Sequence, residues 1–436
     1  MKTTERIIRI GLIFLVLLSL YFSFSIWLSS AKKEQPIKND QQLATAVVNE
    51  RLDTDVFLPL RLIRMQNGVS EMNNSENLIT NIQNEIRQAT FGKLTQVVKD
   101  DASQFENYLT MDQGFELLYE GPFLLSEYMS VYDLSIDLED ITDSDDIHFT
   151  CIQVNLKQNK LRFLNFSSND IYETPISMDN EKVLNLMNKV GVQYNPISEQ
   201  QSLSQKHYYL SDDLKMKKYS YILASQPVTK FRNAFFTNTE DIQTNEDSQD
   251  LSYASRNERL IADEKLGTIH FSGDIENRTA QDNIFSDSFF YIKKLGTSMG
   301  NLRYFDRTKS EINYRTFVEG FPVFSENDKG QVHITIGNDK AEKSSVVIET
   351  SVDTIQVPIP SEEEVQLQST ESLLEQLTLN GADPEKIDSM VIGYTWHKIE
   401  EVTQVVDLTP EWYIRYDGQW SSVPELLEHL ANAEVE

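Results

Sequence analysis

Nineteen consecutive residues near the N-terminus, Ile10 to Leu28, carry no charged side chain. An α-helix rises about 1.5 Å per residue, so a helix over this stretch would be about as long as the hydrocarbon core of a bilayer is thick. The residues that follow, up to 436, are polar and acidic overall. The sequence therefore predicts one transmembrane helix, residues 10–28, that carries a large region on one side of a membrane.

The charges beside this span predict its orientation. Three basic side chains precede it, Arg6 and Arg9 among them, and two lysines follow it before the chain becomes acidic. Excess positive charge on the short N-terminal side favours residues 1–9 in the cytoplasm and the remainder outside the cell. A cleavable signal peptide is the alternative, since Ser29-Ser30-Ala31 has small residues at the spacing of a cleavage site. The span is longer than a usual signal sequence, which favours a retained anchor in the cell membrane.

One face of the predicted helix carries mostly small residues. Gly11, Leu15, Ser19 and Ser23 recur every four positions, so they lie close to one another on the helix surface. Small residues on one face let a second transmembrane helix approach closely. We therefore predict that this face contacts another helix, although glycine and serine are also ordinary residues in membrane helices.

The charge of the chain excludes some classes of partner. The formal net charge is −29, and because the first 33 residues carry a net +4, the remaining residues carry −33. Nucleic acids, anionic lipid headgroups and anionic wall polymers all require a basic surface, so none is an expected partner of this region. The single cysteine, Cys151, excludes a disulfide framework and is expected to be a small buried side chain.

No motif for catalysis, metal binding or a cofactor is found. The six histidines are isolated, no histidine–glutamate zinc motif is present, and no glycine-rich phosphate loop can be assembled. The acidic run Asp143–Asp146 resembles the start of a calcium loop but lacks its glycine and closing glutamate, so a solvated loop is expected. The sequence thus predicts no enzyme, no metal site and no cofactor.

Hydrophobic periodicity predicts an α+β ectodomain. After a polar linker at 29–50, the pattern divides into an N-terminal domain (51–200), a central domain (201–340) and a C-terminal domain (341–436), each with mainly antiparallel sheets and helices. Helical spacing appears at Asn77–Ala89, with Ser75 as the N-cap. A strand at Phe115–Tyr119 is expected to end at Gly121-Pro122.

The last 45 residues are rich in aromatic side chains. Asp417-Gly418 lies between alternating aromatic positions and predicts a β-hairpin whose turn residues both have positive φ. Trp412, Tyr413, Arg415 and Trp420 could form the core of a small sheet. They are equally the residue types that dominate protein-binding surfaces, which makes them a candidate interface.

Several segments resemble the YycH family of membrane-anchored regulators. The resemblance spans the whole chain in length and order, and it is carried by five segments: Ser25-Ile26-Trp27, Val56–Arg61, Ala234-Phe235-Phe236, Tyr314–Phe324 and Leu408–Tyr416. The acidic segments 133–146 and 240–250 depart from the usual family pattern.

The resemblance implies a non-enzymatic function and specific partners. YycH-like proteins act with the companion protein YycI on the sensor histidine kinase YycG (WalK) of a cell-wall two-component system, through transmembrane and ectodomain contacts. Two other classes stay open from the residues alone. One is a sensor of wall fragments or peptides, with a groove lined by residues such as Trp396 and Trp420. The other is an exported wall hydrolase without short motifs.

Overall fold

The computed structural model describes residues 50–141, 144–199, 208–245, 250–275, 283–337, 344–359, 361–399 and 404–433. All of them belong to one compact unit, which extends from Val48 to Glu436. Within these ranges, no helix has the length and apolar character needed to cross a membrane. The predicted span at 10–28, and with it Gly11, Leu15, Ser19 and Ser23, lies outside the described residues.

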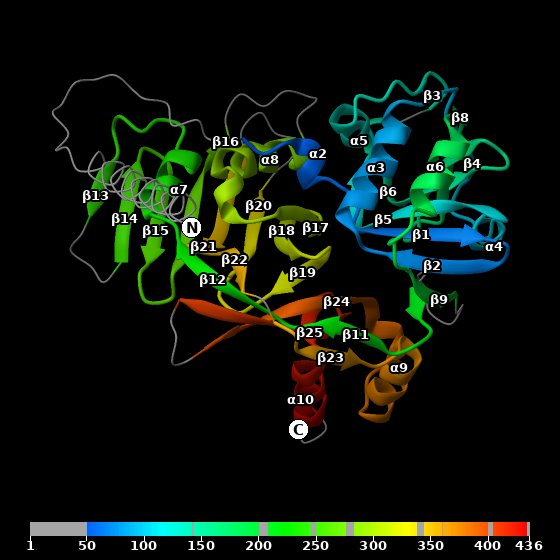
Figure 1. The fold of residues 1–436 in the computed structure, drawn as a ribbon. Helices are drawn as coiled ribbons and strands as arrows, with labels where there is room; N and C mark the ends of the chain where they lie inside the picture. Colours follow the sequence, from blue (N-terminus) through cyan, green and yellow to red (C-terminus); the bar gives the residue numbers. More distant parts are fainter. Residues whose placement is uncertain are drawn as a thin grey trace, which may run out of the picture. The chain divides into compact units, whose positions relative to one another are not determined.

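The first part of the chain forms a ten-stranded sheet (Figure 1) with the order β10-β9-β2-β1-β5-β6-β7-β8-β3, and β4 also pairs with β8. The strands are β1 Arg61–Gln66, β2 Val69–Asn73, β3 Thr90–Phe91, β4 Thr95–Val98, β5 Gln113–Leu124, β6 His148–Asn155, β7 Lys160–Asn165, β8 Asp170–Ser177, β9 Asn195–Glu199 and β10 Tyr208–Leu210. The helices of this part are α2 Asp53–Val56, α3 Glu76–Arg87, α4 Ala102–Glu106, α5 Leu125–Val131, the short η1 Ser144–Asp146 and α6 Asn180–Met187.

Two local predictions in this part are confirmed and one is wrong. Helix α3 has Ser75 as its N-cap, although the Ser75 side chain accepts no capping hydrogen bond. Cys151 is fully buried in β6. The strand expected to end at Gly121-Pro122 instead continues to Leu124, because a bulge between Leu118 and Phe123 takes the glycine and proline out of the hydrogen-bonded ladder.

A second sheet of fourteen strands contains most of the remaining chain, in the order β13-β14-β15-β16-β21-β20-β18-β19-β24-β25-β12-β22, with β17 on β18 and β26 on β25. Its strands are β12 Tyr219–Ser225, β13 Gln243–Asn245, β14 Asp250–Ser255, β15 Glu258–Asp263, β16 Thr268–Ile275, β17 Leu302–Arg307, β18 Glu311–Val318, β19 Phe321–Phe324, β20 Gln331–Ile336, β21 Ser344–Ser351, β22 Asp353–Ile359, β24 Ile387–Lys398, β25 Val405–Tyr416 and β26 Gln419–Ser422. A separate pair consists of β11 Leu214–Lys217 and β23 Glu364–Leu367.

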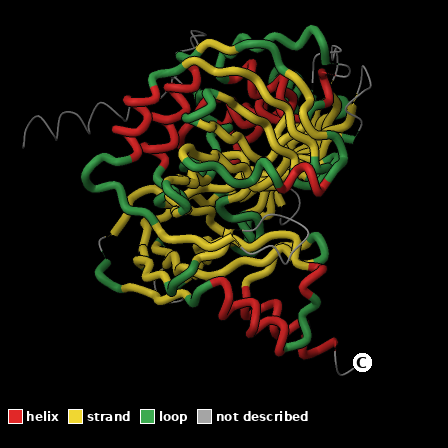
Figure 2. Tube along the Cα trace, turned by 90° about the vertical axis from the view of Figure 1, so that its right-hand side faces the viewer, coloured by secondary structure: helices red, strands yellow, loops and turns green. Residues whose placement is uncertain are grey.

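The helices of this second part are α7 Val228–Phe235, α8 Ile284–Leu295, η2 Thr297–Met299, α9 Thr370–Leu379, η3 Pro384–Lys386 and α10 Val423–Ala433. Helix α7 packs against α8, and α10 packs against β25 and β26. Figure 2 shows strands gathered in the interior and helices toward the outside. The α+β class with mainly antiparallel sheets is confirmed for the described residues, where the ladder between β19 and β24 is parallel.

Strands from both sides of residue 340 are interleaved in this sheet. Strand β21, which follows residue 340, pairs with β16 and β20, whereas β12, which precedes it, pairs with β22 and β25. A boundary between a central and a C-terminal domain at residue 340 would therefore divide strands that are hydrogen-bonded to one another in a single sheet. The predicted hairpin is confirmed, since Asp417 and Gly418 have φ of 50° and 80° in the turn between β25 and β26.

Candidate functional site

The segment Val56–Arg61 runs from the last residue of α2 to the first residue of β1 and is inserted between the two sheets. The ring of Phe57 is fully buried and lies 5.2 Å from that of Phe123 in the first sheet and 6.0 Å from that of Phe285 on α8. Tyr119 and Tyr132 both donate hydrogen bonds to the carbonyl oxygen of Phe57. We call residues 56–61 the entry segment, because they lead from α2 into β1, the first strand of the described unit.

Arg303 of β17 holds the entry segment in place. Its side chain is 1% exposed. Its Nη2 donates to the carbonyl oxygens of Leu58 and Pro59, at 3.0 and 2.7 Å, and its Nη1 lies 3.0 Å from a carboxylate oxygen of Glu76. Burial lowers the pKa of Arg303, and the neighbouring Glu76 opposes that effect. One guanidinium thus links three chain segments that are distant in sequence.

A second polar contact joins the bulge of β5 to the C-terminal strands. Glu120 accepts from Arg61 at 2.5 Å and from the hydroxyl of Ser389. Burial raises the pKa of Glu120, and Arg61 opposes this rise. The adjacent Gly121 packs so closely on β17 that an added Cβ would lie 2.6 Å from the hydroxyl of Tyr304.

An aromatic cluster completes this junction. It contains Leu60, Phe305, Phe317, Phe324, Val391 and Tyr413, with Trp420 packed against it. The rings of Phe324 and Tyr413 stack with centroids 3.7 Å apart, and the indole of Trp420 donates to Asp306 at 2.7 Å. The cluster therefore packs the entry segment, through Leu60, against strands β17, β18, β19, β24 and β25 of the second sheet.

Two residues of the predicted aromatic surface belong to this interior. Trp412 and Tyr413 are each 5% exposed, on opposite faces of β25, so they are core residues in the structure and not part of an accessible surface. Arg415 and Trp420 are directly opposed across β25 and β26 and are partly exposed. Binding of a partner by Arg415 and Trp420 stays a prediction.

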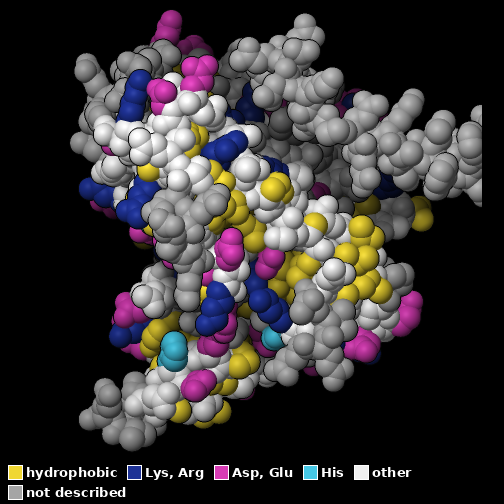
Figure 3. Space-filling view, turned by 90° about the vertical axis from the view of Figure 1, so that its left-hand side faces the viewer, with side chains coloured by type: hydrophobic (Ala, Val, Ile, Leu, Met, Phe, Trp, Pro, Cys, Tyr) yellow, Lys and Arg dark blue, Asp and Glu magenta, His cyan; other side chains and the backbone are white. Residues whose placement is uncertain are grey.

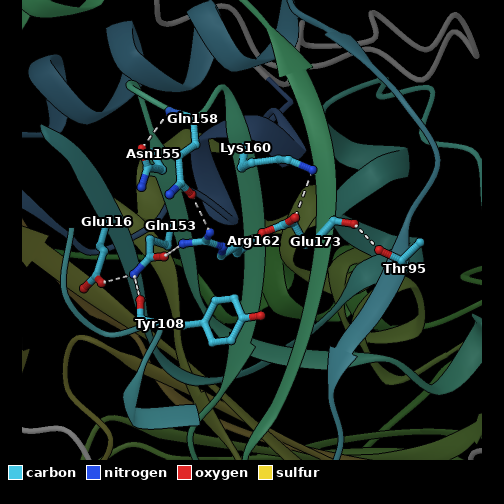
Figure 4. Close-up of polar contacts among 9 residues, drawn as sticks. All are labelled: Thr95, Tyr108, Glu116, Gln153, Asn155, Gln158, Lys160, Arg162 and Glu173. Atoms are coloured by element: carbon cyan, nitrogen blue, oxygen red, sulfur yellow. Dashed lines mark hydrogen bonds and ion pairs between the residues drawn. The ribbon is translucent and has the colours of Figure 1, made fainter. Parts of the chain in front are cut away.

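A buried polar row crosses the first sheet (Figure 4). Directly opposed positions on β5, β6, β7 and β8 place Glu116, Gln153, Arg162 and Glu173 side by side. Gln153 donates to Glu116, and Arg162 donates to Gln153 and to Glu173 at 2.9 and 2.8 Å. The ring of Tyr108 lies over the guanidinium of Arg162 at 4.8 Å. A buried row satisfied in this way fixes strand register, since a slip of one residue would break every contact.

An exposed apolar pair lies on the last two strands of the large sheet. Ile222 of β12 and Val357 of β22 are directly opposed, and they are 43% and 54% exposed. Val405 of β25 lies opposite Ile222 on its other side. Strand β22 ends the pairing order of this sheet. Exposed apolar side chains next to an open sheet edge are typical of protein-binding surfaces.

Charges on the surface are of both signs. Figure 3 shows acidic and basic side chains interspersed with hydrophobic ones on one face, without an expanse of either sign. Within the described ranges, no group of three or more histidine, cysteine or acidic side chains is placed to hold a metal ion. The features that stand out are therefore a rigid junction and an apolar edge.

Sequence patterns did not indicate the central residues of the junction. Arg303 and Glu120 lie in strands, as does Arg162 of the polar row, and a charged side chain in a strand is normally assigned to the solvent-facing side. Their partners are up to 269 positions away in sequence, as for Glu120 and Ser389. The one local signal is Gly121-Pro122 within an apolar strand, a combination that marks a bulge.

Comparisons with known proteins give a family. Residues 204–430, just over half of the chain, match the family model described as YycH protein, C-terminal domain. The crystal structure of YycH from Bacillus subtilis superposes with a TM-score of 0.67 at 13% identity, covering 86% of this chain and 97% of that one. At this identity the superposition shows a shared fold. Among curated proteins, none matches the chain.

Proposed function

The chain belongs to the YycH family, whose members are regulators of the YycG/WalK system, and on that premise we propose that it modulates the sensor histidine kinase YycG together with YycI. The match over residues 204–430 is the observation that carries this proposal. In the proposed arrangement, residues 10–28 anchor the chain in the cell membrane and the described unit lies outside the cell. The protein has no catalytic step of its own.

The junction supports this proposal physically. Arg303, Glu120 and the aromatic cluster tie the entry segment to strands of both sheets. A regulator shifts a kinase between two states only as far as it binds one of them better, and coupling of about 1–3 kcal/mol is typical. In the proposed arrangement, contacts of the anchor and contacts of the ectodomain both contribute to that preference.

The helix face gives the first test. Replacing Gly11, Ser19 and Ser23 together by Leu is expected to reduce recovery of the kinase with the full-length protein by about tenfold, because bulky side chains keep two membrane helices apart. Phe24→Leu changes a side chain on the opposite side of the helix, at about 100° of rotation per residue, and is the control. Co-purification from membranes measures the effect. Unchanged recovery with the triple variant would remove this face from the proposal.

The apolar edge gives the second test. Ile222→Asp and Val357→Asp are expected to reduce recovery of YycI by about tenfold, since a carboxylate buried without a partner opposes association. Val69→Asp is the matched control, because Val69 is similarly exposed, at 56%, but lies on β2 of the first sheet. Circular dichroism establishes that each variant is folded. Equal recovery by all three would show that the edge is not an interface.

A further inference from the structure

A polar cleft of about 520 Å³ opens where the first sheet faces β11 and the turn between β18 and β19. One wall runs from the end of β2 into the first turn of α3, and Gln193 and Asn195 extend it. The other walls are β11 and residues 319–321. The volume lies within the range of about 300–1,000 Å³ that is usual for small-molecule sites.

The walls of the cleft are fixed by close backbone contact. Gly320 has a φ of 83°, and a Cβ at this position would lie 1.9 Å from the carbonyl oxygen of Asn74. Tyr394, which is 1% exposed, donates from its hydroxyl to the carbonyl oxygen of Lys217 in β11. The three walls therefore stay at set positions relative to one another, as a preformed binding site requires.

Residues with side-chain amides line this space, and while Asn73 and Asn301 are already hydrogen-bonded within the fold, others are not. The side chains of Asn77, Gln193 and Asn195 make no hydrogen bond with the described residues. The buried side-chain oxygen of Asn74 also lacks a partner there. Each amide offers donors and an acceptor, so together they present both kinds of group to a ligand. Hydroxyl-rich ligands, which donate and accept at each oxygen, match such a lining.

Aromatic faces and a balanced charge complete the lining. Tyr219 and Phe321 are partly exposed beside the cleft, and both pack on the ring of Tyr394, at 5.7 and 6.3 Å. Two lysines, at 215 and 217, face two carboxylates, at 76 and 319. This balance does not favour an anionic polymer. A pyranose ring has hydroxyl groups around its edge and apolar C–H groups on its faces, so it matches a lining of amides and aromatic rings.

We infer that this cleft binds a saccharide, with side-chain amides contacting hydroxyl or acetamido groups and Tyr219 or Phe321 lying against a ring face. The site does not contain Trp396 or Trp420, the residues from which an aromatic groove was expected. It is also separate from the apolar edge at Ile222 and Val357. The inference is independent of the regulatory function and does not require it.

The experiment uses the full-length protein in a detergent without a sugar headgroup and measures binding by isothermal titration calorimetry. The probes are the tetrasaccharide of N-acetylglucosamine, maltotetraose and tetra-alanine. Saturable binding of at least one saccharide is expected, weakened about tenfold in Asn77→Ala and in Asn195→Ala. Asn257→Ala, an exposed asparagine in the turn between β14 and β15, should bind like the unmodified protein.

Three outcomes would overturn the inference. They are no binding of either saccharide, binding that neither cleft variant weakens, and binding of tetra-alanine alone, which would make the cleft a peptide site. Because the side chains of Asn77 and Asn195 make no hydrogen bond with the described residues, folding of the variants should be retained. The melting temperature of each variant checks this. Tyr219→Ala tests the aromatic wall of the same cleft and should also weaken saccharide binding.

Discussion

Replacing Arg303 by Met is expected to lower the free energy of unfolding by about 3–5 kcal/mol. The methionine would fill similar space but would leave the carbonyl oxygens of Leu58 and Pro59 buried without a donor. The contact of the guanidinium with the ring of Phe317, at 4.6 Å, would also be lost. Glu76 contributes less to the loss, because its side chain is 31% exposed and can be solvated.

Urea unfolding of the purified protein, followed by far-ultraviolet circular dichroism, measures this effect. Arg259→Met is the control, because Arg259 is exposed on β15 and its replacement should change stability by no more than about 0.5 kcal/mol. A loss below about 1 kcal/mol for Arg303→Met would mean that the entry segment is held mainly by the burial of Phe57 and not by the guanidinium.

Local patterns in the sequence were sufficient for many elements. The helix expected at 77–89 is observed at Glu76–Arg87, and the Asp-Gly turn has the positive φ values that its residue types favour. These signals are local because a helix or a two-residue turn is decided by residues a few positions apart. The strand through Gly121-Pro122 was missed, since its continuation depends on packing against β17, far along the chain.

Pairing between distant strands could not be predicted in the same way. Nothing near residue 340 indicates that β21 lies between β16 and β20, or that β12 lies between β25 and β22. The aromatic residues near the C-terminus show the same limit, because composition is alike for a core and for an interface. Whether such a residue is in the core or at an interface depends on residues distant in sequence. Tyr413, for example, is buried because the ring of Phe324 stacks on it. The cleft likewise depends on residues brought together from six separate segments.

Replacing Arg162 by Met is expected to lower the free energy of unfolding by about 3–5 kcal/mol at neutral pH, because its side chain is 8% exposed and bonds two members of the polar row. Without the guanidinium, the side-chain oxygen of Gln153 would lose its hydrogen-bond donor inside the sheet. Glu173 would keep Lys160 as its ion-pair partner. Arg87→Met, at an exposed position on α3, is the control and should be close to neutral.

The pH dependence of this stability loss distinguishes the loss of hydrogen bonds in the polar row from the loss of side-chain packing. Burial alone would raise the pKa of Glu173, but the hydrogen bonds from Arg162 and Lys160 outweigh it and hold the pKa below the ordinary value. A lowered pKa contributes stability at neutral pH that is lost as the pH falls through the folded-state pKa. The stability difference between the unmodified protein and Arg162→Met should therefore narrow below about pH 4.5, the ordinary range of a glutamate.

Adding Glu173→Met to Arg162→Met completes a double-mutant cycle for this pair. The two changes should cost less together than the sum of the single changes, because the double variant removes both partners of one ion pair and leaves neither charge unpaired. Urea unfolding at neutral and acidic pH measures all four proteins. Strictly additive losses, or a difference that stays constant with pH, would show that Arg162 acts through its packing on Tyr108 and not through the polar row.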